Sequence, residues 1–98
     1  MNEIELQAFL AEARIERVVL EAWVERRWIV PADAAAPLAL DAADAARACL
    51  IRDLSGDFGV NDAGIDVALH LIDQLHDLRR VLDALRAGLD ASAADDRG

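Results

Sequence analysis

Apolar side chains recur at helical spacing over the first part of the chain and then stop doing so. Residues 3–13 and 15–27 carry apolar positions three or four apart, which predicts two short helices joined by a tight turn at Arg14. Pro31 and Pro37 then exclude a helix. The short runs "WIVP" and "LAL" around them favour two β-strands. The pattern therefore predicts a helix-turn-helix followed by a small two-stranded wing.

A third helix is predicted over residues 42–54. Asp41 is placed to cap it, and the spacing turns five side chains inward: Ala45, Ala46, Cys49, Leu50 and Leu54. The stretch "SGDFGV" (55–60) ends this helix. Its letters "DFG" match a kinase metal-binding motif, but the chain has no lysine and no glycine-rich phosphate loop. Phe58 is instead expected to plug the core beneath a turn that Gly59 permits.

The fourth predicted helix is long and has two apolar faces. It follows a cap at Asn61 and runs to about Ala87, where Gly88 can end it. One face serves the core over the first half of the helix: Ile65, Leu69 and Ile72. The other face, the leucine seam, has heptad spacing and continues further: Ala68, Leu71, Leu75, Leu78, Leu82, Leu85 and Leu89. No other predicted helix is long enough to cover this seam, so we expect it to pair with a second copy in a homodimer.

The boundaries of these elements indicate a single helical domain over residues 1–90, followed by a disordered tail over residues 91–98. The fold class is mainly α, with the small wing as its only β-structure.

A third face of the long helix is acidic. It carries the residues that we name the acidic strip: Asp62, Asp66, Asp73 and Asp77. Two interpretations stay open, a solvated face that keeps the protein soluble or a docking surface for a basic helix. Glu21 and Glu25 on the second helix are another candidate docking surface.

The charge balance bears on the class of partner. The chain has 98 residues and a net charge of −9, with 19 carboxylates against ten basic residues, all of them arginine. Phosphate contacts supply most of the affinity for nucleic acid, so this charge disfavours such a partner and favours a basic protein. No signal peptide or membrane-spanning stretch is visible in the sequence, which indicates a cytoplasmic protein without membrane contact.

Residues for catalysis or metal binding do not stand out. His70 and His76 are six positions apart and do not share a helix face, so a metal would need ligands from elsewhere. Cys49 has no histidine nearby in the sequence and is expected to be a small buried side chain. We therefore expect no enzyme activity, no metal and no cofactor.

Three segments carry a resemblance to a known family: "LEAWVERRWIVP" (20–31), "ALDAADAARACLIRDL" (39–54) and "GVNDAGIDVALHLIDQLHDLRR" (59–80). In this order and spacing, the chain resembles a MerR-type winged helix-turn-helix and, more closely, the CbpM family of chaperone modulators. The likeness covers about residues 4–87. The first helix matches in length but in few residues, and the tip of the wing is unusually rich in alanine.

The resemblance implies a homodimer that binds the J-domain of a DnaJ-like cochaperone of the CbpA type. It would thereby keep that domain from stimulating the Hsp70 ATPase. A J-domain presents a basic helix, which an acidic surface suits. Two surfaces stay open as the docking site: the acidic strip, or Glu21 and Glu25 on the second helix.

The alternative is a MerR-type transcriptional regulator with its second helix in the DNA major groove. Residues 1–30 hold four arginines against six carboxylates, the reverse of what a DNA-reading element normally has. Trp23 is expected in the core, whereas Trp28 could be either a core residue or an exposed anchor for a partner.

Overall fold

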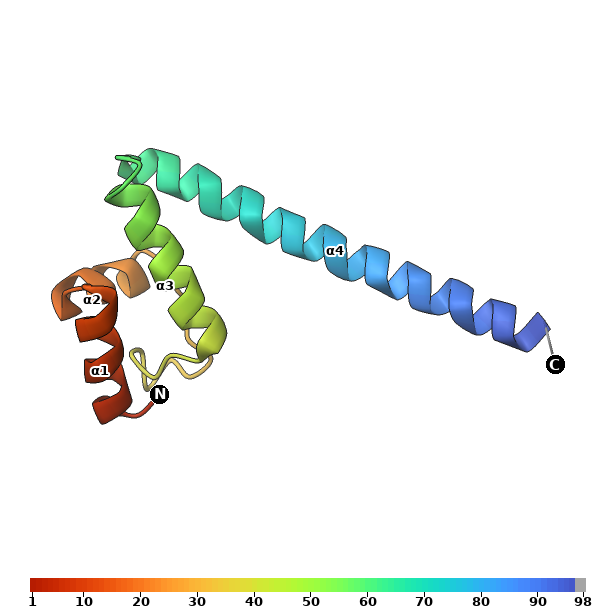
Figure 1. The fold of residues 1–98 in the computed structure, drawn as a ribbon, viewed down its shortest axis with the longest axis horizontal. Helices are drawn as coiled ribbons and strands as arrows, with labels where there is room; N and C mark the ends of the chain where they lie inside the picture. The colour runs from red at the N-terminus through yellow and green to blue at the C-terminus, as the bar shows by residue number, and fades with distance from the viewer. Residues whose placement is uncertain (97–98) are drawn as a thin grey trace. The chain divides into compact units, whose positions relative to one another are not determined.

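The computed structural model describes residues 1–96, with side chains through residue 92. This part of the chain holds four helices: α1 (Glu3–Ala13), α2 (Arg17–Glu25), α3 (Ala42–Ser55) and α4 (Asp62–Asp96). Figure 1 shows their order along the chain. The chain divides into a compact unit over Met1–Asp66 and a second unit from Val67 onward, so that α4 belongs to both.

Helix α1 is fixed at both ends by local interactions. The Asn2 side chain accepts a hydrogen bond from the Glu5 backbone N–H at 2.8 Å, and the Glu5 carboxylate accepts one from the Asn2 N–H at 3.1 Å. The helix ends at Arg14, which adopts a left-handed conformation with φ 58° and donates its backbone N–H to the Leu10 carbonyl. Helix α2 begins three residues later, which confirms the predicted turn between two short helices.

The predicted wing is wrong. The segment between α2 and α3 contains no strand and is built from local turns. Two such turns place the Ala36 N–H on the Asp33 carbonyl and the Ala39 N–H on the Ala36 carbonyl, each at 3.0 Å. Pro31 and Pro37 have no backbone N–H to give to a strand ladder, which explains why the segment satisfies its polar groups locally.

Helix α3 begins at the predicted cap but turns a different face inward. Asp41 and Asp44 form a reciprocal capping box, with the Asp44 N–H 2.8 Å from the Asp41 carboxylate. Ala48 and Ile51 are the buried residues of this helix. Of the five side chains predicted to point inward, Ala46 is exposed and the other four are only half-buried. Alanines on several sides of the helix make its apolar face hard to locate from spacing alone.

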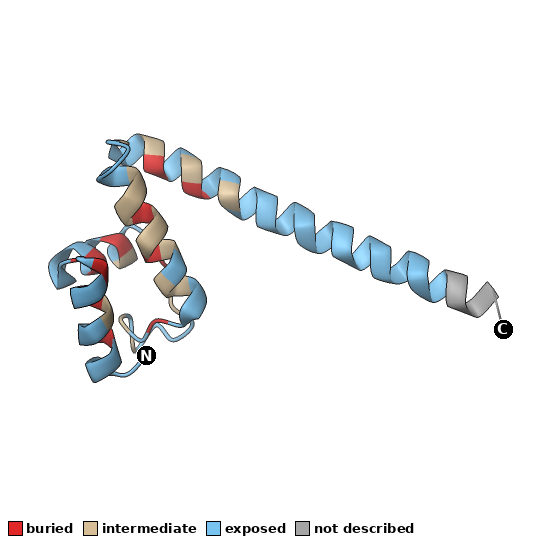
Figure 2. Cartoon of the chain, in the orientation of Figure 1, coloured by how far each residue is buried: buried red, intermediate tan, exposed pale blue. Residues whose placement is uncertain are grey.

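The core consists of one cluster of large apolar side chains. Its members that are most completely enclosed are Leu6, Leu20, Ile29, Leu40, Ile51 and Ile65. Figure 2 shows the buried positions on α1, α2, α3, the loop before α3 and the start of α4. Trp23 is buried as predicted, and Trp28, whose position the sequence left open, is only 5% exposed.

The turn between α3 and α4 corrects another prediction. Phe58 is 74% exposed and does not plug the core. Gly59 has φ 62°, so the expected left-handed turn is confirmed. The Val60 N–H donates a hydrogen bond to the Leu54 carbonyl at 2.8 Å and so links the end of the turn to the last turns of α3. Asn61 then accepts a hydrogen bond from the Gly64 N–H at 2.8 Å and caps α4, as predicted.

Helix α4 carries the predicted core face over its first turns. Ile65 and Leu69 are buried and Ile72 is half-buried, whereas from residue 73 to residue 92 every side chain is exposed. The helix does not end near Ala87 but continues through Gly88 to Asp96. Residues 91–96 of the predicted tail are therefore helical, and residues 97–98 lie outside the described residues. None of the helices in the described part of the chain is long and apolar enough to span a membrane.

Candidate partner-binding surfaces

The first two carboxylates of the acidic strip are engaged within the chain. Asp62 forms an ion pair with Arg26, with 2.8 Å between Oδ2 and Nη1. Asp66 accepts a hydrogen bond from the indole N–H of Trp28. The guanidinium of Arg26 also lies 5.1 Å from the centre of the Trp28 ring. This half of the strip therefore connects the start of α4 to the segment that follows α2.

The other two carboxylates of the strip also have partners. Asp77 forms an ion pair with Arg80, one turn along the same helix. Asp73 takes part in a polar or electrostatic interaction as well. The four aspartates thus present less unpaired charge than their spacing alone indicates.

Glu21 and Glu25 lie one helical turn apart on the exposed side of α2. The Glu21 carboxylate is 3.5 Å from Nε of Arg17. Glu25 is exposed and makes no ion pair with any residue in the described part of the chain. Of the six carboxylates predicted to bind a partner, Glu25 is the one most available to an incoming cation.

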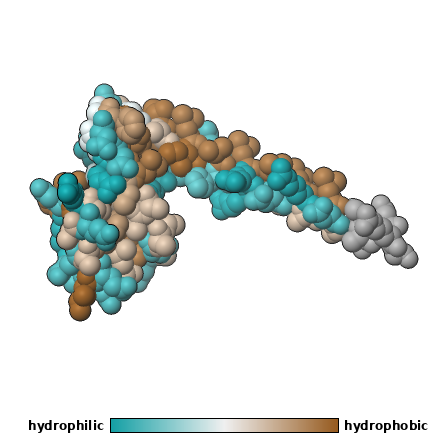
Figure 3. Space-filling model, viewed as in Figure 1, coloured by the Kyte–Doolittle hydropathy of each residue, from teal (hydrophilic) through white to brown (hydrophobic). Residues whose placement is uncertain are grey.

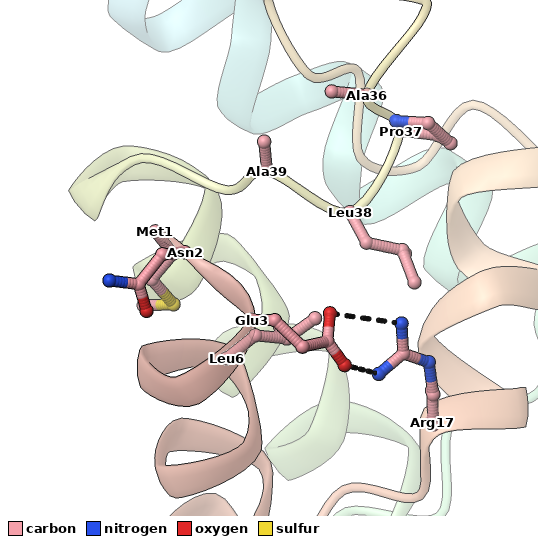
Figure 4. A pocket seen from close by; sticks show the side chains of 9 residues that line it. All are labelled: Met1, Asn2, Glu3, Leu6, Arg17, Ala36, Pro37, Leu38 and Ala39. Carbon is pink, nitrogen blue, oxygen red and sulfur yellow. Dashed lines mark hydrogen bonds and ion pairs between the residues drawn. The ribbon is translucent and has the colours of Figure 1, made fainter.

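Arg17 connects the first two helices by a salt bridge to Glu3. Its two terminal nitrogens face the two carboxylate oxygens of Glu3, and Figure 4 shows this paired contact with Leu38 pointing toward it. The hydrogen bond from Arg17 lowers the pKa of the Glu3 carboxyl group below its usual 4.5, and the same bond raises the pKa of Arg17. The positive charge of Arg17 is therefore already matched inside the protein.

A groove that the sequence did not predict runs between α2 and the loop over residues 29–38. A hollow of about 300 Å³ is lined by Glu21, Val24, Glu25, Pro37 and Leu38. A neighbouring hollow of about 320 Å³ shares three of its lining residues and extends along the loop to Val30 and Asp33. Those three shared residues are Val24, Glu25 and Pro37. We refer to the two hollows together as the α2 groove.

A third hollow adjoins the α2 groove. It has about 380 Å³ and lies beside the salt bridge between Glu3 and Arg17, where Pro37 and Leu38 form part of its wall (Figure 4). The signal for these surfaces in the sequence is weak: Pro37 and Leu38 are large side chains directly after an alanine-rich stretch.

Of the four arginines in residues 1–30, two are paired with carboxylates, whereas Arg14 and Arg27 are exposed and make no ion pair with the described residues. Arg17 faces Glu3 and Glu21, and Arg26 faces Asp62 and the ring of Trp28. The segment over residues 28–41, where a wing was predicted, contains no basic residue. Phosphate backbones are bound by clustered arginine and lysine side chains, so a net charge of −9 and a segment 28–41 without a basic residue do not favour nucleic acid.

The leucine seam of α4 is exposed along its length. Leu71, Leu75, Leu78, Leu82, Leu85 and Leu89 are each at least 46% exposed, and Val67 and Val81 beside them are exposed as well. Figure 3 shows apolar side chains following one edge of this helix. Nothing in the described part of the chain covers the six leucines, as expected for a surface that pairs with another helix.

The candidate metal ligands do not assemble into a site. His70 lies 3.3 Å from the Gln74 amide nitrogen on the next turn of α4. Among the described residues, no group of three or more histidine, cysteine, aspartate or glutamate side chains is arranged to hold a metal ion. Cys49 is half-buried on α3 and is not part of such a group.

Comparison with known proteins finds one family that matches most of the chain. The family model described as MerR HTH family regulatory protein matches residues 4–87, most of the chain. Neither the curated proteins nor the solved structures that were compared with the chain include a significant match. The matched residues include the two short helices α1 and α2, their turn at Arg14, α3 and the greater part of α4. The chain therefore belongs to the MerR HTH family of regulatory proteins.

Proposed function

We propose that the protein is a chaperone modulator that binds the J-domain of a DnaJ- or CbpA-like cochaperone. By occupying the J-domain it prevents that domain from stimulating Hsp70. One observation carries the proposal: α2, the second helix of the helix-turn-helix, exposes Glu21 and Glu25 while Arg17 on the same helix is held by carboxylates. A basic helix, such as a J-domain presents, finds complementary charge on that surface.

The net charge of the whole chain also supports a basic protein as the partner. At a net charge of −9 the protein attracts a basic partner at long range and repels phosphate backbones. Such attraction mainly accelerates association and selects among partners, while apolar contacts near the centre of the interface supply most of the binding energy. The proposed activity is binding alone, without catalysis and without a cofactor.

The proposal includes a homodimer formed through the leucine seam. Burying a leucine side chain stabilises an assembly by roughly 1.5–3 kcal/mol, so six exposed leucines are a strong reason for two copies to associate. A dimer would carry two copies of the helix-turn-helix and could hold two J-domains.

The direct test is a titration of the purified protein with an isolated J-domain, followed by a steady-state assay of Hsp70 ATPase activity. We expect binding with one J-domain per chain, affinity that falls as salt is raised, and loss of the stimulation that the J-domain alone produces. An ATPase rate that stays at the stimulated level with the protein in excess would argue against the proposal.

A second function is favoured by the family match itself. The model that matches describes regulatory proteins with a helix-turn-helix, and α1, the turn at Arg14 and α2 have that arrangement. Fluorescence anisotropy with duplex DNA over a series of salt concentrations tests it. Tight binding with a steep salt dependence would favour a DNA-binding regulator over a chaperone modulator.

A further inference from the structure

We propose that the α2 groove is the surface on which the protein receives a basic amphipathic helix of its partner. This inference rests on the proposed function, and it chooses between the two acidic surfaces that the sequence left open. The groove is lined by apolar side chains together with Glu25, which makes no ion pair with the described residues, whereas each carboxylate of the acidic strip already has a partner.

Two kinds of residue line the first hollow. Val24, Pro37 and Leu38 supply apolar side chains around a space large enough for one or two side chains of a partner. Glu21 and Glu25, one helical turn apart on α2, supply the two carboxylates of the lining. A partner helix that places an apolar side chain between lysines or arginines at a spacing of four residues matches both features.

The second hollow lengthens the site in one direction. Val30, which is 66% exposed, and Asp33 line its far part, so an apolar contact and a carboxylate recur further along the loop. Arg27 is the one basic residue among those that line the two hollows, against three carboxylates. The net negative charge and the apolar residues recurring in two adjoining hollows favour a cationic amphipathic helix over a compact ligand.

The acidic strip is the weaker candidate because a partner would have to compete for it. Asp62 and Asp66 hold Arg26 and Trp28, and displacing Asp66 would leave the indole N–H of a buried tryptophan without its acceptor. Glu25 can bind a cation without breaking any ion pair of the described residues.

The groove does not suit a second copy of this chain. Each copy has a net charge of −9, so two acidic surfaces facing one another would repel. The apolar surface that suits a second copy is the leucine seam, which lies on α4 in the other compact unit.

The test uses methyl-labelled full-length protein and two probes: an isolated J-domain, and a synthetic helical peptide with leucines flanked by lysines four residues apart. On addition of each probe, we expect NMR shifts at the methyl groups of Val24, Val30 and Leu38. Glu25→Lys should weaken binding of both probes at least about tenfold. Glu12→Lys, which makes the same charge change at an exposed site that does not line the groove, is the matched control.

The outcomes separate the groove from the proposed function. One contrary result is a J-domain that binds but changes the NMR shifts of methyl groups outside the groove, and another is equal weakening of its binding by the two lysine variants. Either result would refute the groove as the binding surface and leave the proposed function standing. If the peptide binds in the groove and the J-domain does not bind, the proposed function fails and the groove stands. If neither probe shifts these methyl groups, the groove is refuted.

Discussion

The indole N–H of Trp28 donates a hydrogen bond to the carboxylate of Asp66, across 38 positions of sequence. Arg26 lies over the same indole ring and forms an ion pair with Asp62, one helical turn before Asp66. Two aspartates near the start of α4 therefore hold the segment that follows α2. Their acidity also suits the positive N-terminal end of the helix, so both have structural roles whether or not a partner binds them.

Replacing Asp66 with alanine should destabilise the first compact unit by about 1–3 kcal/mol, because the buried Trp28 loses the acceptor of its N–H. Asp66→Asn keeps a side-chain oxygen in place and should cost less. Urea denaturation followed by tryptophan fluorescence measures both variants. Alanine and asparagine variants of equal stability would show that the hydrogen bond does not contribute.

Features that depend on neighbouring residues could be predicted from the sequence. The cap at Asp41, the turn at Arg14 and the leucine seam each arise within a few residues or from a regular repeat, and all three are present. The bond between Trp28 and Asp66 joins distant positions, and no local pattern indicates it. The same holds for the α2 groove, which exists because the loop with Pro37 and Leu38 lies beside α2.

Two errors have simple physical causes. The size and apolar character of Phe58 predict a core position, but its neighbours Asp57 and Gly59 belong to an exposed tight turn. The short apolar runs predict two strands. Ile29 and Leu40 from those runs are indeed buried, yet the prolines between them prevent a ladder of hydrogen bonds.

The leucine seam predicts the effect of a charge at its centre. Leu78 is 67% exposed within one chain, so Leu78→Asp should leave the fold of a single chain nearly unchanged. In a dimer the same change buries an unpaired carboxylate between two helices and should dissociate the pair. Sedimentation velocity should therefore report a monomer. Its unfolding midpoint should also fall and become independent of protein concentration.

Ala84→Asp is the control for this experiment. Ala84 is exposed on α4 but lies outside the seam, so the variant adds the same charge without entering the proposed interface. We expect it to sediment as the wild-type protein does. A dimer that persists in Leu78→Asp, or that is lost in both variants, would contradict the seam as the contact.

The salt bridge between Glu3 and Arg17 predicts a dependence of stability on pH. The pKa of the Glu3 carboxyl group is lowered in the folded protein. The salt bridge therefore contributes to the free energy of unfolding above the usual pKa of 4.5, and this contribution is lost as the pH falls through the folded-state pKa. At neutral pH the wild-type protein should therefore have a higher Tm than the Glu3→Gln variant. The difference in Tm should vanish in acid. The pair is exposed to solvent, so the difference should be small and should shrink with added salt. A Tm difference that grows as the pH is lowered would have the wrong sign.

The turn at Arg14 predicts a variant that is more stable than the natural protein. With φ 58° and ψ 45°, Arg14 occupies the left-handed region, where a side chain beyond Cα costs roughly 1 kcal/mol. Glycine removes that cost but gives the unfolded chain more freedom, so Arg14→Gly should gain up to about 1 kcal/mol in urea denaturation. Arg14→Ala removes the same charge and keeps the Cβ, so it should gain nothing. If glycine and alanine proved equally stable, the left-handed backbone would not be the source of the cost. Arg14 does not line the α2 groove, so the more stable variant should bind a J-domain with unchanged affinity.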